Sequence, residues 1–136
     1  MGWPASRNGV IAIQATDFLG KPFHNNTSRG ESKERFATLG LNIHLGGYHV
    51  KGEKNESARS YATDTAVGIA ANAIEFARYK VHLTEDRKRR LFSRSFVVNI
   101  FKKMMTRRGG CEYIQLWTLW EREDICDVLL EAISDC

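Results

Sequence analysis

Two aspartates in the central stretch of the chain stand where a cation could be bound. Val67, Ala71 and Ile74 recur at three- and four-residue spacing, which predicts one apolar stripe along a helix. Asp64 precedes Val67 by three residues and Ala71 by seven, so we expect it on the same stripe. Asp86 stands where the strand expected after this helix ends. A buried carboxylate is costly unless it is paired. Two acids directed at one place from two elements therefore predict a cation site.

Two further acids belong to the same hypothesis. Asp17 ends the first apolar run, GVIAIQATD, and Asp127 lies in the last expected helix. Each of the four also has a structural alternative. Asp17 could cap a turn, Asp64 could lie near an exposed helix start, Asp86 could cap the following helix, and Asp127 could belong to a solvated acidic face.

The elements that must position these acids follow from hydrophobic periodicity. We expect one α/β domain over residues 1–136, with the order βββαβαβα in a mixed sheet. The first three strands form an antiparallel meander with a turn at Gly46-Gly47, and the fourth follows a crossover helix and runs parallel to an earlier strand. The expected strands are 9–17, 34–45, 48–51, 80–84 and 112–120, and the expected helices are about 57–78, 87–108 and 121–133.

The element order and the four acids resemble the ribonuclease H family. The first strand ends ATDFLG, near that family's TDG, and KVHLTED is similar to its fourth strand, which ends in an aspartate. The tail DICDVLLEA is similar to the family's final helix. The resemblance covers residues 9–133. The chain departs from the family at Phe18, where glycine is usual, and at Asp64, where the family has glutamate.

The resemblance implies a ribonuclease H-like fold and a two-metal endonuclease that cleaves the RNA strand of RNA–DNA hybrids. Two Mg²⁺ (or Mn²⁺) ions about 3.5–4 Å apart would activate water and stabilise the leaving oxygen. In this scheme Asp17 and Asp86 bridge the metals, and Asp64 and Asp127 lie on either side.

A basic segment predicts an anionic partner. The chain of 136 residues has a net charge of +4, and residues 87–108 contain nine Lys and Arg residues without one acid. A helix that is merely soluble usually mixes the two signs. We expect nucleic acid, an RNA–DNA hybrid or double-stranded RNA, to contact these side chains through its phosphates; the alternative is a solvated helix face. The residues are Arg87, Lys88, Arg89, Arg90, Arg94, Lys102 and Lys103.

Two other classes of function stay open. Three strands followed by HVKGEKNESARSYATDTA also look somewhat like a double-stranded-RNA-binding domain, which would bind without cleaving. A small viral or mobile-element protein could instead use the basic segment against an acidic protein surface. Trp117 and Trp120, three apart in an expected strand, would point to opposite faces, either to stack on a nucleotide or to pack in the core.

The remaining composition constrains location and partners. No apolar run approaches the roughly 18 residues that cross a membrane, and no signal peptide is visible, so we expect an intracellular protein without a membrane partner. Three cysteines, Cys111, Cys126 and Cys136, form no CxxC pair and are expected to be reduced thiols.

Overall fold

The computed structural model describes residues 9–17, 35–40, 44–45, 48–49, 55–108 and 111–135. Over these residues the chain is an α/β fold with a four-stranded mixed sheet, a two-stranded sheet and five helices. It divides into two compact units. Unit 1 comprises Met1–Ala66 and Thr106–Ile114, and unit 2 comprises Val67–Met105 and Gln115–Cys136. The expectation of a single domain stays a prediction.

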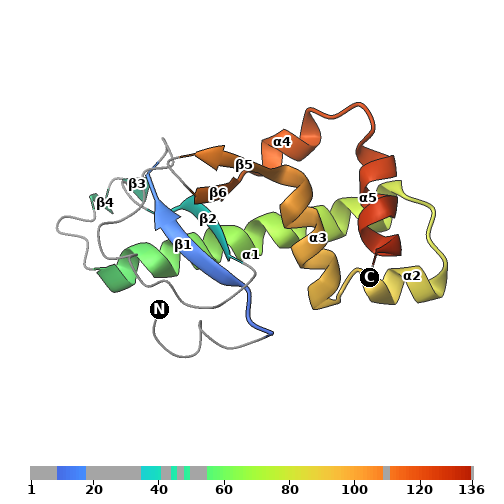
Figure 1. Cartoon of the computed structure of the whole chain (residues 1–136), viewed down its shortest axis with the longest axis horizontal. Helices are drawn as coiled ribbons and strands as arrows, with labels where there is room; N and C mark the ends of the chain where they lie inside the picture. Colours follow the sequence, from blue (N-terminus) through green and yellow to red (C-terminus); the bar gives the residue numbers. More distant parts are fainter. Residues whose placement is uncertain are drawn as a thin grey trace. The chain divides into compact units, whose positions relative to one another are not determined.

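The larger sheet is built from strands far apart in the sequence (Figure 1). Its order is β1-β2-β6-β5, with β1 parallel to β2 and β2 parallel to β6. Only two residues separate β5 from β6, so these two strands run antiparallel. A separate antiparallel pair joins β3 and β4. The strands are β1 (Ala12–Thr16), β2 (Arg35–Leu39), β3 (His44–Leu45), β4 (Tyr48–His49), β5 (Met105–Arg108) and β6 (Cys111–Ile114).

Small side chains let helix α1 (Asn55–Lys80) lie close to β1 in unit 1. Ala15 of β1 and Ala62 of α1 are both fully buried in one cluster, against which Ile13 packs. Alanine at both positions brings the helix backbone near the strand, because neither side chain extends beyond its Cβ atom. The alanines of α1 therefore allow close packing against β1 in addition to favouring the helical conformation.

Two buried threonines tie the three parallel strands together. The Thr16 hydroxyl of β1 donates to the Thr38 carbonyl oxygen of β2 at 3.2 Å. The Thr38 hydroxyl donates in turn to the Ile114 carbonyl oxygen of β6 at 3.3 Å. Both threonines are buried, so their hydroxyl groups would be costly without partners. In contrast, Thr106 Oγ1 of β5 is buried and has no hydrogen-bond partner in the described part of the chain.

Replacement by valine should have opposite effects on the free energy of unfolding at Thr38, which is hydrogen-bonded, and at Thr106, which has no hydrogen-bond partner in the described chain. Thr38→Val removes the bond to β6 with little change of shape and should lower the free energy of unfolding by about 1 kcal/mol. Thr106→Val removes a buried hydroxyl that has no partner and should raise it by up to about 1 kcal/mol. Urea unfolding followed by circular dichroism measures both changes. Two changes of the same sign would contradict this interpretation.

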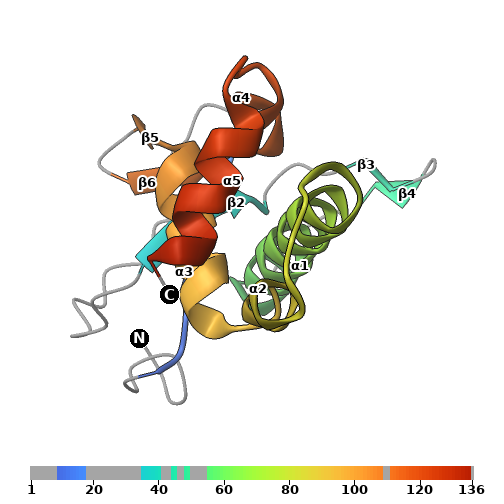
Figure 2. The ribbon, with the colours of Figure 1, turned by 90° about the vertical axis from the view of Figure 1, so that its right-hand side faces the viewer.

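Unit 2 is helical. It contains the second part of α1 and four further helices, of which α3 packs against both α4 and α5, and α2 packs against α5. Figures 1 and 2 show α3 and α5 side by side. Their buried faces carry large apolar residues, including Phe96, Ile100 and Met104 of α3 and Leu129 and Ile133 of α5. The helices are α2 (Glu85–Arg90), α3 (Arg94–Met104), α4 (Leu116–Trp120) and α5 (Ile125–Ser134). In the described residues, no helix has both the length and the apolar character needed to cross a membrane.

The antiparallel meander expected for the first strands is wrong. β1 and β2 are parallel, and β3 and β4 form a sheet of their own. Phe36, Ala37 and Thr38 of β2 are buried in succession, as is usual for a strand covered on both faces in a parallel arrangement. The antiparallel pairing of β3 with β4 is as expected, but the turn at Gly46-Gly47 lies outside the described residues.

The strand expected at 80–84 is also absent from the structure. α1 continues to Lys80, and the Val81 amide still donates to the Ala77 carbonyl oxygen at 3.2 Å. Thr84 then caps α2, because its hydroxyl accepts from the Arg87 amide at 3.3 Å. The sequence TED, interpreted as the end of a strand, is thus the start of a helix.

Three more of the expected elements differ in the structure. The helix expected over 87–108 is divided into α2 and α3 by the cap residue Ser93, and it ends before β5. The strand expected over 112–120 ends at Ile114, and α4 follows, since the apolar run LWTLW fits a short helix as well as a strand. The last helix begins at Ile125 rather than at residue 121.

Candidate nucleic-acid interface

The four expected metal-binding acids are divided between the two units. Asp17 directly follows β1 and Asp64 lies on the part of α1 that belongs to unit 1. Asp86 and Asp127 belong to unit 2, each in the first turn of its helix, where a negative charge is favoured. Asp86 Oδ2 is 3.0 Å from Arg90 Nη2.

Asp64 lies on the exposed side of α1, so the expected phase of this helix is wrong. Val67 is 63% exposed, and Asp64 and Ala71 are also exposed. Because alanine and other apolar residues occur around most of this helix, spacing alone does not identify its buried face. The buried side is formed by Ala62, Ala66, Ile69, Ala73 and Ala77.

The described residues do not assemble a metal-binding group. Within these ranges, no three His, Cys, Asp or Glu side chains gather closely enough to hold one ion. The Mg²⁺ or Mn²⁺ site at Asp17, Asp64, Asp86 and Asp127 stays a prediction.

The basic residues gather where α2 turns into α3. We call residues 87–94 the α2–α3 corner. Arg87, Lys88, Arg89 and Arg94 are exposed there. Phe92, which lies between them in the sequence, is 67% exposed. An exposed aromatic ring in a segment with exposed cationic side chains can contact the bases of a nucleic acid while the cations contact its phosphates.

Local hydrogen bonds and one buried side chain fix the shape of this corner. The Phe92 and Ser93 amides donate to the carbonyl oxygens of Arg89 and Arg90 at 3.2 and 3.1 Å. The Ser93 hydroxyl accepts from the Phe96 amide at 3.2 Å and so caps α3. Leu91 is fully buried between the half-buried Arg90 and the exposed Phe92, which anchors the corner in unit 2. The exposure of Phe92 is thus a consequence of the backbone geometry.

Part of the positive charge of the corner is balanced within α2. Lys88 Nζ lies 3.3 Å from Glu85 Oε1, and Asp86 pairs with Arg90 as described above. Exposed pairs of this kind contribute little free energy, so an incoming phosphate can compete for these cations. Among the described residues, no ion pair engages Arg87 or Arg89.

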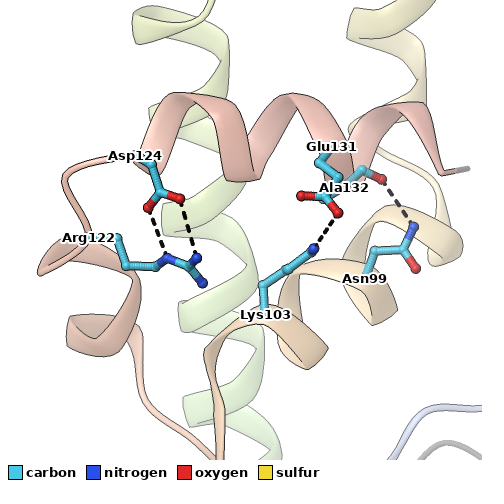
Figure 3. Close-up of polar contacts among 6 residues, drawn as sticks. All are labelled: Asn99, Lys103, Arg122, Asp124, Glu131 and Ala132. Atoms are coloured by element: carbon cyan, nitrogen blue, oxygen red, sulfur yellow. Dashed lines mark hydrogen bonds and ion pairs between the residues drawn. The ribbon is translucent and has the colours of Figure 1, made fainter.

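The two other basic residues expected at the site lie at the far end of α3. Lys102 is exposed there, about two helical turns from Arg94. Lys103 is half-buried, and its Nζ lies 2.8 Å from Glu131 Oε1 of α5 (Figure 3). The Asn99 side-chain amide donates to the Ala132 carbonyl oxygen at 3.0 Å, also between α3 and α5. Lys103 therefore joins two helices in this structure.

A second ion pair orders the segment before α5 (Figure 3). Arg122 donates from Nε to Asp124 Oδ1 at 3.1 Å and from Nη2 to Oδ2 at 3.4 Å. This hydrogen bonding, supported by the charge of the guanidinium, lowers the pKa of Asp124 below its ordinary value. The carboxylate is exposed, so solvent screens the interaction.

We expect Arg122→Gln to raise the pKa of Asp124 towards the ordinary range. An aspartate whose pKa is lowered by folding stabilises the native state above its unfolded pKa, near pH 4, and this contribution disappears as the pH falls through the folded value. Titration of the Asp124 carboxyl carbon by NMR measures the change. Lys102→Gln removes a charge without touching Asp124 and should leave its pKa in place. An Asp124 pKa that does not move in Arg122→Gln would contradict the assignment.

The expected placement of the tryptophans changes because α4 is a helix. Trp117 and Trp120 are one helical turn apart, 53% and 39% exposed, rather than on opposite faces of a strand. The Trp120 ring meets the edge of Phe76 with ring centres 4.5 Å apart. Trp120 thus contributes to packing within unit 2.

The two described cysteines differ in environment. The Cys111 thiol is half-buried and lies 3.8 Å from Gln14 Oε1, to which it donates a weak hydrogen bond. Burial raises its pKa, which disfavours the reactive thiolate. Cys126 is exposed.

Sequence reasoning located the basic residues of the corner but did not single out Phe92. Its four-residue spacing from Phe96 is that of one apolar helix face and gives no sign that the ring is exposed. The informative signal was its place within the run RKRRLFSR, directly before the cap residue Ser93. Comparison of the chain with family models, with curated proteins and with solved structures finds no match. The ribonuclease H resemblance stays a prediction.

Proposed function

We propose that this chain binds single-stranded nucleic acid through the α2–α3 corner and does not cleave it. The observation that carries the proposal is the exposed Phe92 ring among exposed arginine and lysine side chains. Arginine and lysine supply affinity for any phosphate backbone, whereas an aromatic ring selects bases that are free to stack.

The phosphate contacts are assigned to Arg87, Arg89 and Arg94, which are exposed on both sides of the corner. Arginine presents several N–H donors in a planar fork, which suits phosphate oxygens. Contacts of this kind release counterions, so affinity falls steeply with salt and depends little on sequence.

Phe92 favours a single strand over the hybrid or duplex expected from the sequence. The bases of a duplex are stacked on one another, so an exposed ring has no base face to contact unless the duplex opens. In a single strand each base offers such a face. The corner is also fixed by hydrogen bonds and by Leu91, so little ordering is required on binding.

Binding without cleavage is preferred to the nuclease hypothesis for two reasons. Asp86 begins a helix and pairs with Arg90, whereas the nuclease scheme needs it at the end of a strand. Asp64 lies on the exposed side of α1 rather than on the buried stripe. Metal-dependent cleavage of RNA–DNA hybrids is the alternative that the experiments below test.

The first experiment measures the salt dependence of binding to a fluorescent single-stranded oligonucleotide by anisotropy. The double variant Arg87→Gln/Arg89→Gln should bind more weakly, and the slope of log K against log salt should fall by about 0.7 for each lost phosphate contact. Arg122→Gln removes a positive charge that is outside the corner and already paired with Asp124, and it serves as the control. Equal losses in both variants would show that the corner is not the binding surface.

The same oligonucleotide and an end-labelled RNA–DNA hybrid should remain intact with Mg²⁺, with Mn²⁺ and with EDTA. Metal-dependent cleavage that is lost in the Asp86→Asn variant would contradict the proposal and support the nuclease hypothesis. Binding that is absent at low salt for every nucleic acid would instead point to a protein partner.

A further prediction tests the stacking role proposed for Phe92. Phe92→Ala should weaken binding to a single strand by about 1–3 kcal/mol, roughly 5- to 150-fold, because one stacked base is lost. Binding to a duplex of the same sequence should change little. Trp117→Ala, which truncates an exposed ring on α4, is the control. Unfolding measurements should show both variants near wild type, since both rings are exposed. A Phe92→Ala variant that loses duplex and single-strand affinity equally would contradict stacking.

A further inference from the structure

The end of α1 carries a second exposed aromatic ring beside basic side chains. Tyr79 is 76% exposed, more than any other large apolar or aromatic side chain in the described residues. Arg78 and Lys80, its neighbours in the sequence, are also exposed. The Arg78 guanidinium carbon lies 6.0 Å from the centre of the Tyr79 ring, over its face. An exposed ring with cations beside it has the composition of a surface on which bases stack and phosphates are held.

The phase of α1 explains why the Tyr79 ring is exposed. Ala77 and Val81, two residues before and after it, are both buried. The Val81 amide donates to the Ala77 carbonyl oxygen, so the helical geometry continues past Tyr79. Residues two positions apart lie on nearly opposite sides of a helix, so Tyr79 faces solvent while these two residues face the core. Like Phe92, which follows the buried Leu91, it is held outward by the backbone.

The positive charge beside Tyr79 is only partly balanced. Arg78 Nη1 lies 3.1 Å from Glu75 Oε2, and both side chains are exposed. Such a pair contributes little free energy, so a phosphate can compete for the guanidinium. Among the described residues, no ion pair engages Lys80. A phosphate that reaches the end of α1 therefore meets one cation without a partner and one that can exchange its partner.

Tyr79 and the α2–α3 corner belong to the same unit, and basic residues lie between them in the sequence. Both are in unit 2. Residues 78–94 contain seven Lys and Arg residues and two acids, Glu85 and Asp86. Each of these acids is paired with a cation of α2. The segment that joins the two rings is thus positively charged, with its negative charges already engaged.

A single strand of modest length can reach both rings. Phe92 follows Tyr79 by 13 residues, which span at most about 45 Å when fully extended. α2 is helical over six of these residues, and this shortens the span. At about 3.4 Å for each stacked nucleotide, a strand of about 16 nucleotides covers the whole of this distance.

We propose that Tyr79 is a second stacking position for the strand bound at the α2–α3 corner, with Arg78 and Lys80 contacting its phosphates. The preferred ligand is then a single strand long enough to reach both rings. This inference rests on the proposed function of the corner. Once one ring is engaged, the other meets the same strand at a high effective concentration, so two contacts raise the affinity more than either alone. A strand too short to reach both rings lacks this gain.

A series of strand lengths tests the second position on the full chain. Fluorescent oligothymidylates, from a dinucleotide to about 16 nucleotides, are measured by anisotropy, the shortest by competition with the longest. Tyr79→Leu should weaken binding of the longest strand by about 5-fold to 150-fold, the loss of one stacked base. It should leave the shortest almost unchanged, because a short strand still binds at Phe92.

Two control variants separate stacking from other effects of the substitution. Tyr79→Phe keeps the ring and should bind every strand nearly as the wild type does. Trp117→Leu removes an exposed ring elsewhere in unit 2 and should change no affinity. Circular dichroism should show all three variants folded, since both replaced side chains are exposed. A loss in Tyr79→Phe as large as that in Tyr79→Leu would overturn stacking at this position.

The outcomes distinguish this inference from the function on which it rests. If Tyr79→Leu binds the longest strand as the wild type does while Phe92→Ala binds it weakly, the second position is wrong and the proposed function stands. If Phe92→Ala and Arg87→Gln/Arg89→Gln both bind as the wild type does, the proposed function fails and this inference fails with it. A loss in Tyr79→Leu that is the same at every strand length would show that Tyr79 acts only through the corner, and would also overturn the inference.

Discussion

The alanine contact between α1 and β1 is the constraint on which unit 1 depends. Ala62 and Ala15 are fully buried against each other's element, with Ile13 beside them, and no larger pair would allow the same approach. Close packing leaves little tolerance for added volume at such a contact. The same constraint explains the composition of α1, in which small residues on one side meet neighbours while residues such as Val67 stay exposed on the other.

Hydrogen bonding at the ends of the parallel strands extends this arrangement. The Thr16 hydroxyl links β1 to β2 and the Thr38 hydroxyl links β2 to β6, each by donating to a backbone carbonyl oxygen. The Gly40 amide, directly after β2, donates to the Thr16 carbonyl oxygen at 2.9 Å. Such buried polar groups specify how neighbouring strands align, because a shifted alignment would leave them without partners. The two threonines thus select one register among strands that are otherwise similar.

The sequence correctly predicted those elements that depend only on residues within the element itself. β1 and the long helix α1 follow from a β-branched run and from an alanine-rich segment, and both are present. The segment 80–84 was misjudged because capping by Thr84 outweighed a short apolar run, and the parallel pairing of β1 with β2 depends on residues far apart in the chain. The basic residues of the corner are evident in the sequence, but the exposure of Phe92 depends on where α2 ends, at Arg90, and on Ser93 starting α3. The grouping of the acids depends on tertiary structure, which periodicity does not encode.

The division of unit 1 into two separate stretches of sequence has a consequence for synthesis. β6 is made only after α2 and α3, and the bond from Thr38 to Ile114 spans 76 residues. Contacts this distant form late, because a long loop must close before they can form. Until the ribosome releases Ile114, β2 is therefore an edge strand with unpaired backbone groups. Such an edge can pair with another nascent chain, so the interval before β6 arrives is when this protein is most exposed to aggregation and to capture by chaperones.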